Sequence, residues 1–176
     1  PFNLMKKLIT LSILFSFLLI GCTKDDFTWN IKKRACYIKF YNSSEDFFSL
    51  VDINGMSNST VGTGPNNYFE DSPITLKRGQ SYDLHTVFQT TENYITAYAY
   101  FDWNADGDFA DSNESIMISN NPSNTDNYTV INVPSNASKK SSNARFVLRT
   151  GSSTAANPCY EYDSYGEVED YPLEIE

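Results

Sequence analysis

The chain has a single histidine, His85, and no cluster of cysteine and histidine residues. A catalytic triad needs a histidine that a nucleophile and an orienting group both contact, and zinc sites are usually built from grouped Cys and His side chains. His85 lies between Asp83 and Val87 in an alternating pattern typical of a strand, which indicates a packed or surface side chain. A triad hydrolase and a zinc enzyme are therefore not expected.

Basic residues are also scarce, with 13 Lys and Arg against 22 Asp and Glu and a net charge of −9. Proteins that bind nucleic acid present a basic face to the phosphates. The composition therefore excludes nucleic acid from the expected partners.

The apolar run from Leu8 to Ile20 is shorter than the roughly 20 residues that a membrane-spanning helix needs. It follows two lysines and ends at Gly21-Cys22, which predicts a signal peptide over residues 1–21. The Gly-Cys step resembles the bacterial lipobox, so Cys22 is predicted to carry a lipid. Residues 22–35 are predicted to be a tether, and Thr23 to Asp26 resemble a surface-export signal, which places the expected protein on the outer membrane, exposed at the surface.

Two further cysteines, Cys36 and Cys159, remain in the predicted exported chain. An even number of cysteines outside the cytoplasm indicates a disulfide, and only one intrachain pairing is open to them. We expect this bond to join the start of a domain over residues 36–176 to the segment before its last strand.

Short alternating or β-branched segments separated by polar turns indicate an all-β domain. The pattern predicts an antiparallel β-sandwich, jelly-roll or immunoglobulin-like, of about eight strands. Residues 56–67 are polar and are predicted to be a loop. The predicted strands cover residues 37–40, 47–53, 74–76, 82–89, 94–102, 115–118, 128–133, 144–149 and 166–175.

The segment from Asp102 to Phe109 places oxygen-bearing side chains at alternate positions, with Gly107 among them. Calcium takes six to eight oxygen ligands, and a glycine allows the sharp bend of a calcium loop. An EF-hand would have glutamate at position twelve, where this chain has Asn113, and strands flank the loop in place of helices. We therefore predict a calcium site between strands, with ligands from Asp102, Asn104, Asp106, Asp108 and Glu114.

A second acidic segment lies near the C-terminus, where Glu167 and Glu169 would share one face of a strand. One interpretation is a charged edge strand that discourages aggregation. The other is that Glu167, Glu169 or Asp170 completes the calcium site, because the loop alone supplies too few oxygens.

These two segments resemble the signatures of the GEVED domain, a β-rich module of secreted and surface bacterial proteins. The residues that carry the resemblance are Gly166 to Tyr171, Asp102 to Phe109 with Glu114 after it, Pro158-Cys159, Cys36, and Val133 to Ala137. The resemblance extends over about residues 36–175. It implies a domain fold and a cell-surface setting, and it assigns no chemistry.

The expected function is that of a calcium-stabilised binding or adhesion module without catalytic activity, whose ligand is an extracellular glycan or protein. A carboxylate-based glycoside hydrolase using Glu114, Glu167 or Glu169 is one alternative, and a carbohydrate-binding accessory module is another. A purely structural surface protein is the third.

Overall fold

The computed structural model describes residues 36, 38–40, 45–62, 64–151, 157–159 and 165–176. The chain separates into two units, residues 1–31 and 32–176, and the described residues belong to the second. The predicted signal peptide, Cys22 and the tether lie outside the described residues. Within the described part, no helix is long and apolar enough to cross a membrane.

The described residues form strands joined by turns, without a helix, so the prediction of an all-β sandwich is confirmed. There are ten strands in this part of the chain: β1 (Phe47–Ile53), β2 (Met56–Asn58), β3 (Asn66–Tyr68), β4 (Ile74–Leu76), β5 (Ser81–Gln89), β6 (Ile95–Phe101), β7 (Ser115–Ser119), β8 (Asp126–Asn132), β9 (Ser142–Thr150) and β10 (Tyr165–Ile175).

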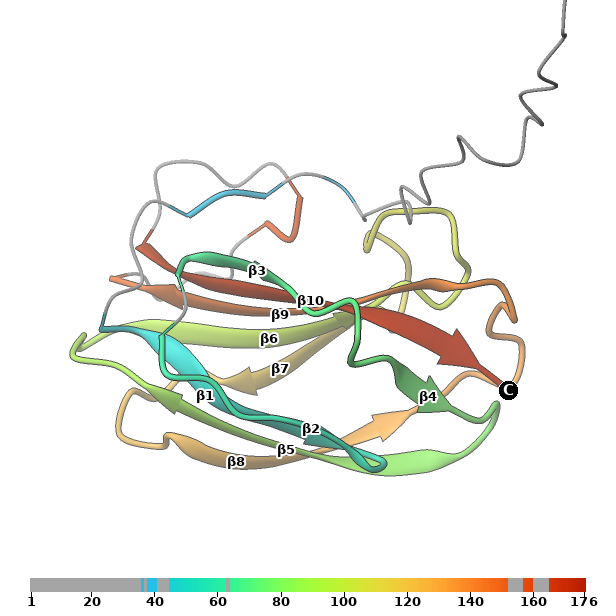
Figure 1. Cartoon of the computed structure of the whole chain (residues 1–176), viewed down its shortest axis with the longest axis horizontal. Helices are drawn as coiled ribbons and strands as arrows, with labels where there is room; N and C mark the ends of the chain where they lie inside the picture. The colour runs from blue at the N-terminus through green and yellow to red at the C-terminus, as the bar shows by residue number, and fades with distance from the viewer. Residues whose placement is uncertain (1–35, 37, 41–44, 63, 152–156, 160–164) are drawn as a thin grey trace, which may run out of the picture. The chain divides into compact units, whose positions relative to one another are not determined.

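The strands lie in two sheets that face each other (Figure 1). One sheet has the order β2-β1-β5-β8, and the other has the order β3-β10-β9-β6-β7 with β4 also beside β10. The strands β3 and β4 run parallel to β10, whereas the remaining pairs are antiparallel. The second sheet is therefore mixed, and the region predicted as a polar loop over residues 56–67 contains β2 and the start of β3.

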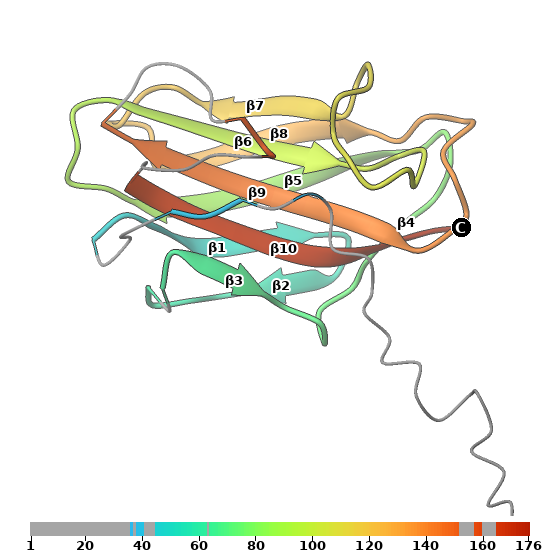
Figure 2. The same ribbon diagram turned by 90° about the horizontal axis from the view of Figure 1, so that it is seen from above.

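Strand β10 lies inside the six-stranded sheet (Figure 2). It pairs with β9 from Tyr165 opposite Thr150 to Leu173 opposite Ser142, and its other edge pairs with β3 and β4. The interpretation of residues 166–175 as a protective edge strand is therefore wrong, because both edges of β10 are hydrogen-bonded.

The main core lies between the sheets and is rich in phenylalanine. Phe48 packs edge-on against Phe88 and Phe146, and Phe101 does the same against Phe146. All four rings are at most 1% exposed. Burying a ring of this size contributes roughly 1.5–3 kcal/mol, so this cluster is a principal source of the free energy of folding.

A second, smaller apolar cluster covers the outer face of the six-stranded sheet, where Cys36 and Cys159 form the predicted disulfide. Their Cα atoms are 5.1 Å apart, and 123 residues separate them in sequence. A crosslink over so long a loop stabilises by roughly 4–5 kcal/mol in the chain-entropy account. The cluster consists of Ile38, Phe40, Tyr100, Phe109, Val147, Cys159 and Val168.

The side chain of Arg145 lies beneath this disulfide and is 2% exposed. Its Nε and Nη2 donate to the two carboxylate oxygens of Asp170 at 2.6 and 2.7 Å. Its Nη1 donates to the carbonyl oxygens of Cys36, at 2.9 Å, and Pro158. One guanidinium therefore joins β9, β10 and both ends of the disulfide-linked segment.

Gly166, the second residue of β10, has a φ of +135°, a backbone conformation that favours glycine. A Cβ here would overlap the carbonyl oxygen of Leu148 and lie 2.9 Å from its carbonyl carbon. We expect Gly166→Ala to lower the free energy of unfolding by at least about 3 kcal/mol, because backbone strain and displacement of β9 add together. Urea unfolding followed by tryptophan fluorescence measures this change.

The matched control is Gly55→Ala, because Gly55 has a φ of +85° and nothing within 4 Å of an added Cβ. It retains the strain and removes the clash, so about 1 kcal/mol is expected. Equal losses in the two variants would show that contact with Leu148 contributes nothing.

Candidate metal centre

The loop over residues 102–114 connects β6 to β7 and begins on a buried carboxylate. Asp102 is 1% exposed, and its two carboxylate oxygens accept hydrogen bonds from the backbone N–H groups of Asp106, at 3.2 Å, and Gly107, at 3.1 Å. Ala105 and Gly107 both have positive φ values, which let the backbone curl around this carboxylate. Burial raises the pKa of Asp102, although these backbone hydrogen bonds act in the opposite direction.

Glu114 fixes the other end of the loop and is also 1% exposed. Its carboxylate accepts hydrogen bonds from the N–H of Trp103 at 2.9 Å and from that of Asp111 at 3.3 Å. Burial raises the pKa of Glu114 to about 7. The indole N–H of Trp103 donates to the carbonyl of Asn113 at 3.0 Å, which ties the two ends of the loop together.

Three exposed carboxylates converge on the outer side of the loop that Asp102 and Glu114 hold in place. Oxygens of Asp106, Asp108 and Asp111 all lie within 4.8 Å of one another. The side-chain amide of Asn104 donates to Asp106 at 2.9 Å and to Asp111 at 2.6 Å. The amide N–H₂ of Asn104 thus lies between two carboxylates that repel each other. A cation at the same position would relieve this repulsion.

Asp111 is a candidate ligand that the alternate spacing did not single out. It lies three residues beyond Asp108 and three before Glu114, so it falls outside the alternation. The available signal was its membership in an acidic stretch without a basic residue. The loop curls through Ala105 and Gly107, and this curl brings Asp111 back toward Asp106.

The donor set of the loop fits calcium. Every candidate ligand is a carboxylate or an amide, and calcium is a hard cation that prefers oxygen. Rotation of the Asn104 side chain would exchange its amide nitrogen for its oxygen, which makes it a fourth ligand beside the three carboxylates. A cavity of about 270 Å³ adjoins the loop and gives water access to it; its lining includes Trp103, Asn104, Asp111, Glu114, Pro134 and Asn136.

The structure does not bring the C-terminal carboxylates into this loop. Across β6, β9 and β10, Phe101 is level with Tyr171, whereas Glu169 is level with Ala99 and Glu167 with Ala97. Both glutamates thus lie two strands away from the loop and at least about 10 Å back along the strand direction. This corrects the expectation of one ion shared by both acidic segments.

Asp170 does not contribute to the loop either, because it is ion-paired with Arg145. It points to the opposite face of β10 from the two glutamates and forms the bidentate ion pair with Arg145. Its carboxylate therefore already has a cationic partner.

Glu167 lies between the two sheets and is 0% exposed. It accepts hydrogen bonds from the backbone N–H of Phe48 at 2.6 Å and from the side-chain amide of Asn67 at 2.7 Å. The pairing of β1 with β5 shifts register between Phe48 and Leu50, so Glu167 contacts β1 at this irregularity. The carboxyl group thereby joins β10 to the opposite sheet.

Glu169 occupies the same inner face and is 1% exposed. It accepts hydrogen bonds from the hydroxyls of Tyr171 at 2.7 Å and Thr60 at 3.4 Å. The Tyr171 hydroxyl in turn accepts from the amide of Asn58 at 2.8 Å, which extends the network to β2. We call Glu167 and Glu169 the buried glutamate pair.

The electrostatics of the buried glutamate pair favour a protonated state. Burial, and next the charge of Glu169, raise the pKa of Glu167 to about 9. Burial raises the pKa of Glu169 to about 7. The basic residues of β9, Arg145 and Arg149, alternate with the inward residues of that strand and lie on its other face. At neutral pH the pair therefore carries at least one proton.

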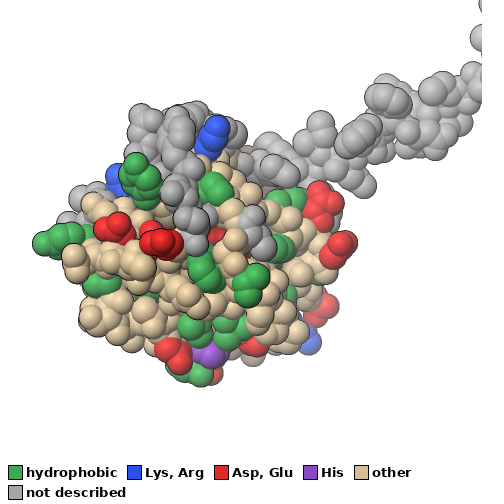
Figure 3. Space-filling view, turned by 60° about the vertical axis from the view of Figure 1, so that its left-hand side comes forward, with side chains coloured by type: hydrophobic (Ala, Val, Ile, Leu, Met, Phe, Trp, Pro, Cys, Tyr) green, Lys and Arg blue, Asp and Glu red, His purple; other side chains and the backbone are tan. Residues whose placement is uncertain are grey.

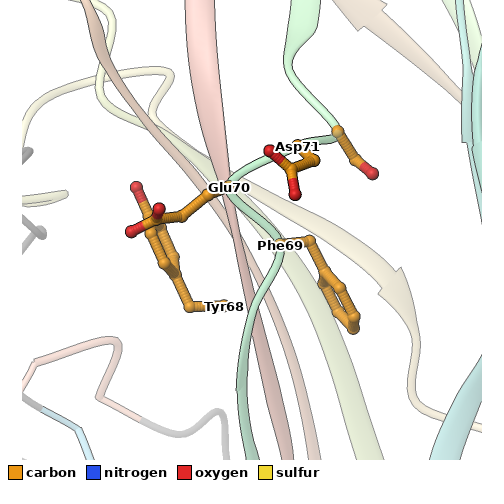
Figure 4. A pocket seen from close by; sticks show the side chains of 5 residues that line it. Tyr68, Phe69, Glu70 and Asp71 are labelled. Atoms are coloured by element: carbon orange, nitrogen blue, oxygen red, sulfur yellow. The ribbon is translucent and has the colours of Figure 1, made fainter.

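A surface pocket of about 420 Å³ lies at the turn after β3 (Figure 4). Tyr68 and Phe69 extend to opposite sides of the backbone there, and Phe69 stacks on Tyr171 with ring centroids 5.2 Å apart. The rest of the lining is Glu70, Asp71 and Ser72. The pocket adjoins the buried glutamate pair through Tyr171, but the glutamates themselves are not part of its lining.

Comparison with known proteins returns one family. The model of the GEVED domain matches residues 96–174, which include strands β6 to β10, the acidic loop and the Gly166–Tyr171 segment. No curated protein matches the chain. The predicted resemblance is thus confirmed over residues 96–174, which match the model of the GEVED domain family.

Proposed function

We propose that the protein is a calcium-stabilised binding module of the bacterial cell surface, without catalytic activity, attached to the outer membrane through a lipid on Cys22. The observation that carries the calcium part is the convergence of Asp106, Asp108 and Asp111 within 4.8 Å. The predicted signal peptide and lipobox support the location. The partners are an extracellular glycan or protein and, through the lipid, the membrane.

Calcium would be held on the outer side of the loop by Asp106, Asp108, Asp111 and the oxygen of Asn104. The ion would supply positive charge to a loop that has five acidic side chains and no basic one. The two buried carboxylates, Asp102 and Glu114, position the backbone beneath these ligands through four backbone N–H groups. The ion would thus complete a loop that is already curved.

Calcium should raise the melting temperature of the purified domain, and Asp106→Asn combined with Asp108→Asn should remove this response. Binding to the folded form alone adds about 2.7 kcal/mol at a calcium concentration a hundred times the dissociation constant. Isothermal titration calorimetry measures the affinity, and differential scanning calorimetry with and without chelator measures the stabilisation.

The matched control is Asp126→Asn, which removes an exposed carboxylate from β8, outside the loop. It should bind calcium like the wild type. If the loop variant and the control bind calcium equally, the ion does not belong to the loop.

The geometry favours binding over glycoside hydrolysis. A glycosidase needs two carboxyl groups on either side of an accessible sugar bond. The three glutamates considered for that role, Glu114, Glu167 and Glu169, are at most 1% exposed. A polysaccharide cannot reach the buried glutamate pair without separation of the two sheets.

A further inference from the structure

The outer face of the four-stranded sheet carries an ordered aromatic pair. In the register of β5 and β8, His85 lies opposite Tyr128, and their rings stack with centroids 4.2 Å apart and planes 5° from parallel. The His85 Nε2 atom lies 2.8 Å from a carboxylate oxygen of Asp126, which fixes the imidazole. His85 packs against one face of the Tyr128 ring, so the ring is held in one orientation.

The other surroundings of Tyr128 are open. Tyr128 is 73% exposed, and Val130, two residues further along β8 on the same face, is 56% exposed. Asp83 lies opposite Val130 and is exposed, and Asp52 lies opposite His85 on β1. In Figure 3 the single histidine lies at the lower rim, with acidic and hydrophobic side chains beside it.

The charge of this sheet has one sign. Strands β1, β2, β5 and β8 contain three aspartates and neither lysine nor arginine. The whole chain has a net charge of −9, so a second copy would be repelled. The Tyr128 face, as we call it, consists of Asp52, Asp83, His85, Asp126, Tyr128 and Val130.

We propose that the Tyr128 face docks a cationic segment of a protein partner. A lysine or arginine would lie over the open face of the Tyr128 ring, where a cation is attracted from within about 6 Å of the centroid. Its aliphatic stem would cover Val130, and Asp83 and Asp52 would balance further basic side chains. A neutral glycan could stack on the ring and donate hydroxyl hydrogen bonds to the carboxylates, but it brings no positive charge to balance them. The inference rests on the proposed function only in that the domain is a binding module, and calcium takes no part in it.

The test uses the purified wild-type domain and a synthetic peptide of alternating lysine and alanine, with a glutamine-for-lysine peptide and neutral oligosaccharides as comparison probes. Backbone chemical-shift changes on titration should locate the lysine peptide on β5 and β8. Tyr128→Ala should weaken its binding about two- to fivefold, and Tyr128→Phe should retain it. Asp52→Asn with Asp83→Asn should weaken it by a further factor of about two to five.

The charge-matched control is Glu70→Gln with Asp71→Asn, which removes two exposed carboxylates near β3. It should leave the affinity for the lysine peptide within about twofold. An equal loss in this control, shifts centred on residues 102–114, or binding of the neutral oligosaccharides in place of the lysine peptide would each overturn the proposal. Calcium binding, measured on the same samples, reports separately on the proposed function.

Discussion

Between pH 5 and pH 9, in the presence of a chelator, the protein is expected to lose on the order of 7 kcal/mol of its free energy of unfolding through the buried glutamate pair. In the unfolded chain Glu167 and Glu169 ionise near their ordinary pKa of 4.5, whereas in the folded protein they do so at about 9 and about 7. The unfolded state therefore binds fewer protons throughout this window, and stability falls as the pH rises. Urea unfolding at a series of pH values measures the slope.

The assignment is tested with Glu167→Gln combined with Glu169→Gln, which removes both titrating groups and retains their size. Glu114 also has a raised pKa, so its share of the pH dependence is measured with a separate Glu114→Gln variant and subtracted. After this subtraction, the free energy of unfolding of the double variant should vary by less than about 1 kcal/mol over the same pH range. Glu70→Gln, at an exposed site, is the matched control and should keep the wild-type slope. Retention of the full slope in the double variant would show that the buried glutamate pair is not its source.

Arg145→Met is expected to lower the free energy of unfolding by about 3–5 kcal/mol. The change leaves Asp170 charged and buried, and it removes the donor to the carbonyls of Cys36 and Pro158. Removal of one partner from a buried ion pair costs about this much because the remaining charge is uncompensated. Unfolding in urea without reductant measures the change while the disulfide stays closed.

Two further variants separate charge from packing. Arg145→Met with Asp170→Leu removes both charges and should recover at least about 1 kcal/mol relative to the single variant. Arg149→Met, on the same face of β9 but less buried, should cost less than about 1 kcal/mol. A loss below 1 kcal/mol for Arg145→Met itself would mean that the ion pair does not hold β9 to β10.

Much of the fold follows from local pattern. The alternation from Tyr82 to Phe88 predicts the inward and outward sides of β5, and burial follows it, with Leu84, Thr86 and Phe88 inside. The spacing of Asp102, Asn104, Asp106 and Asp108 predicts a curled acidic loop. The Asp102 carboxylate stabilises that curl by accepting hydrogen bonds from the backbone N–H groups of Asp106 and Gly107. The calcium itself remains a prediction.

The environment of the C-terminal motif could not be predicted in the same way. The partners of Glu167 include the backbone of Phe48, 119 residues away, and that of Asp170 is Arg145 on the neighbouring strand. Local sequence therefore makes residues 167–170 resemble a solvent-facing strand, although tertiary contacts bury all of them. The short strands β2 and β3 were missed for a related reason, because their polar residues pair with β1 and β10 and carry no apolar period of their own.

The position of β10 also determines when the domain can fold during its synthesis. Strands β3 and β4 reach the six-stranded sheet only through β10, so their places are not available until the last strand has been made. Most of the contacts in such a sheet join distant parts of the chain, which slows folding. A growing polypeptide that has completed β9 still lacks the strand that carries both inter-sheet glutamates and the partner of Arg145. The six-stranded sheet is therefore completed only after residues 165–175 have been synthesised, although its other strands precede them in the chain.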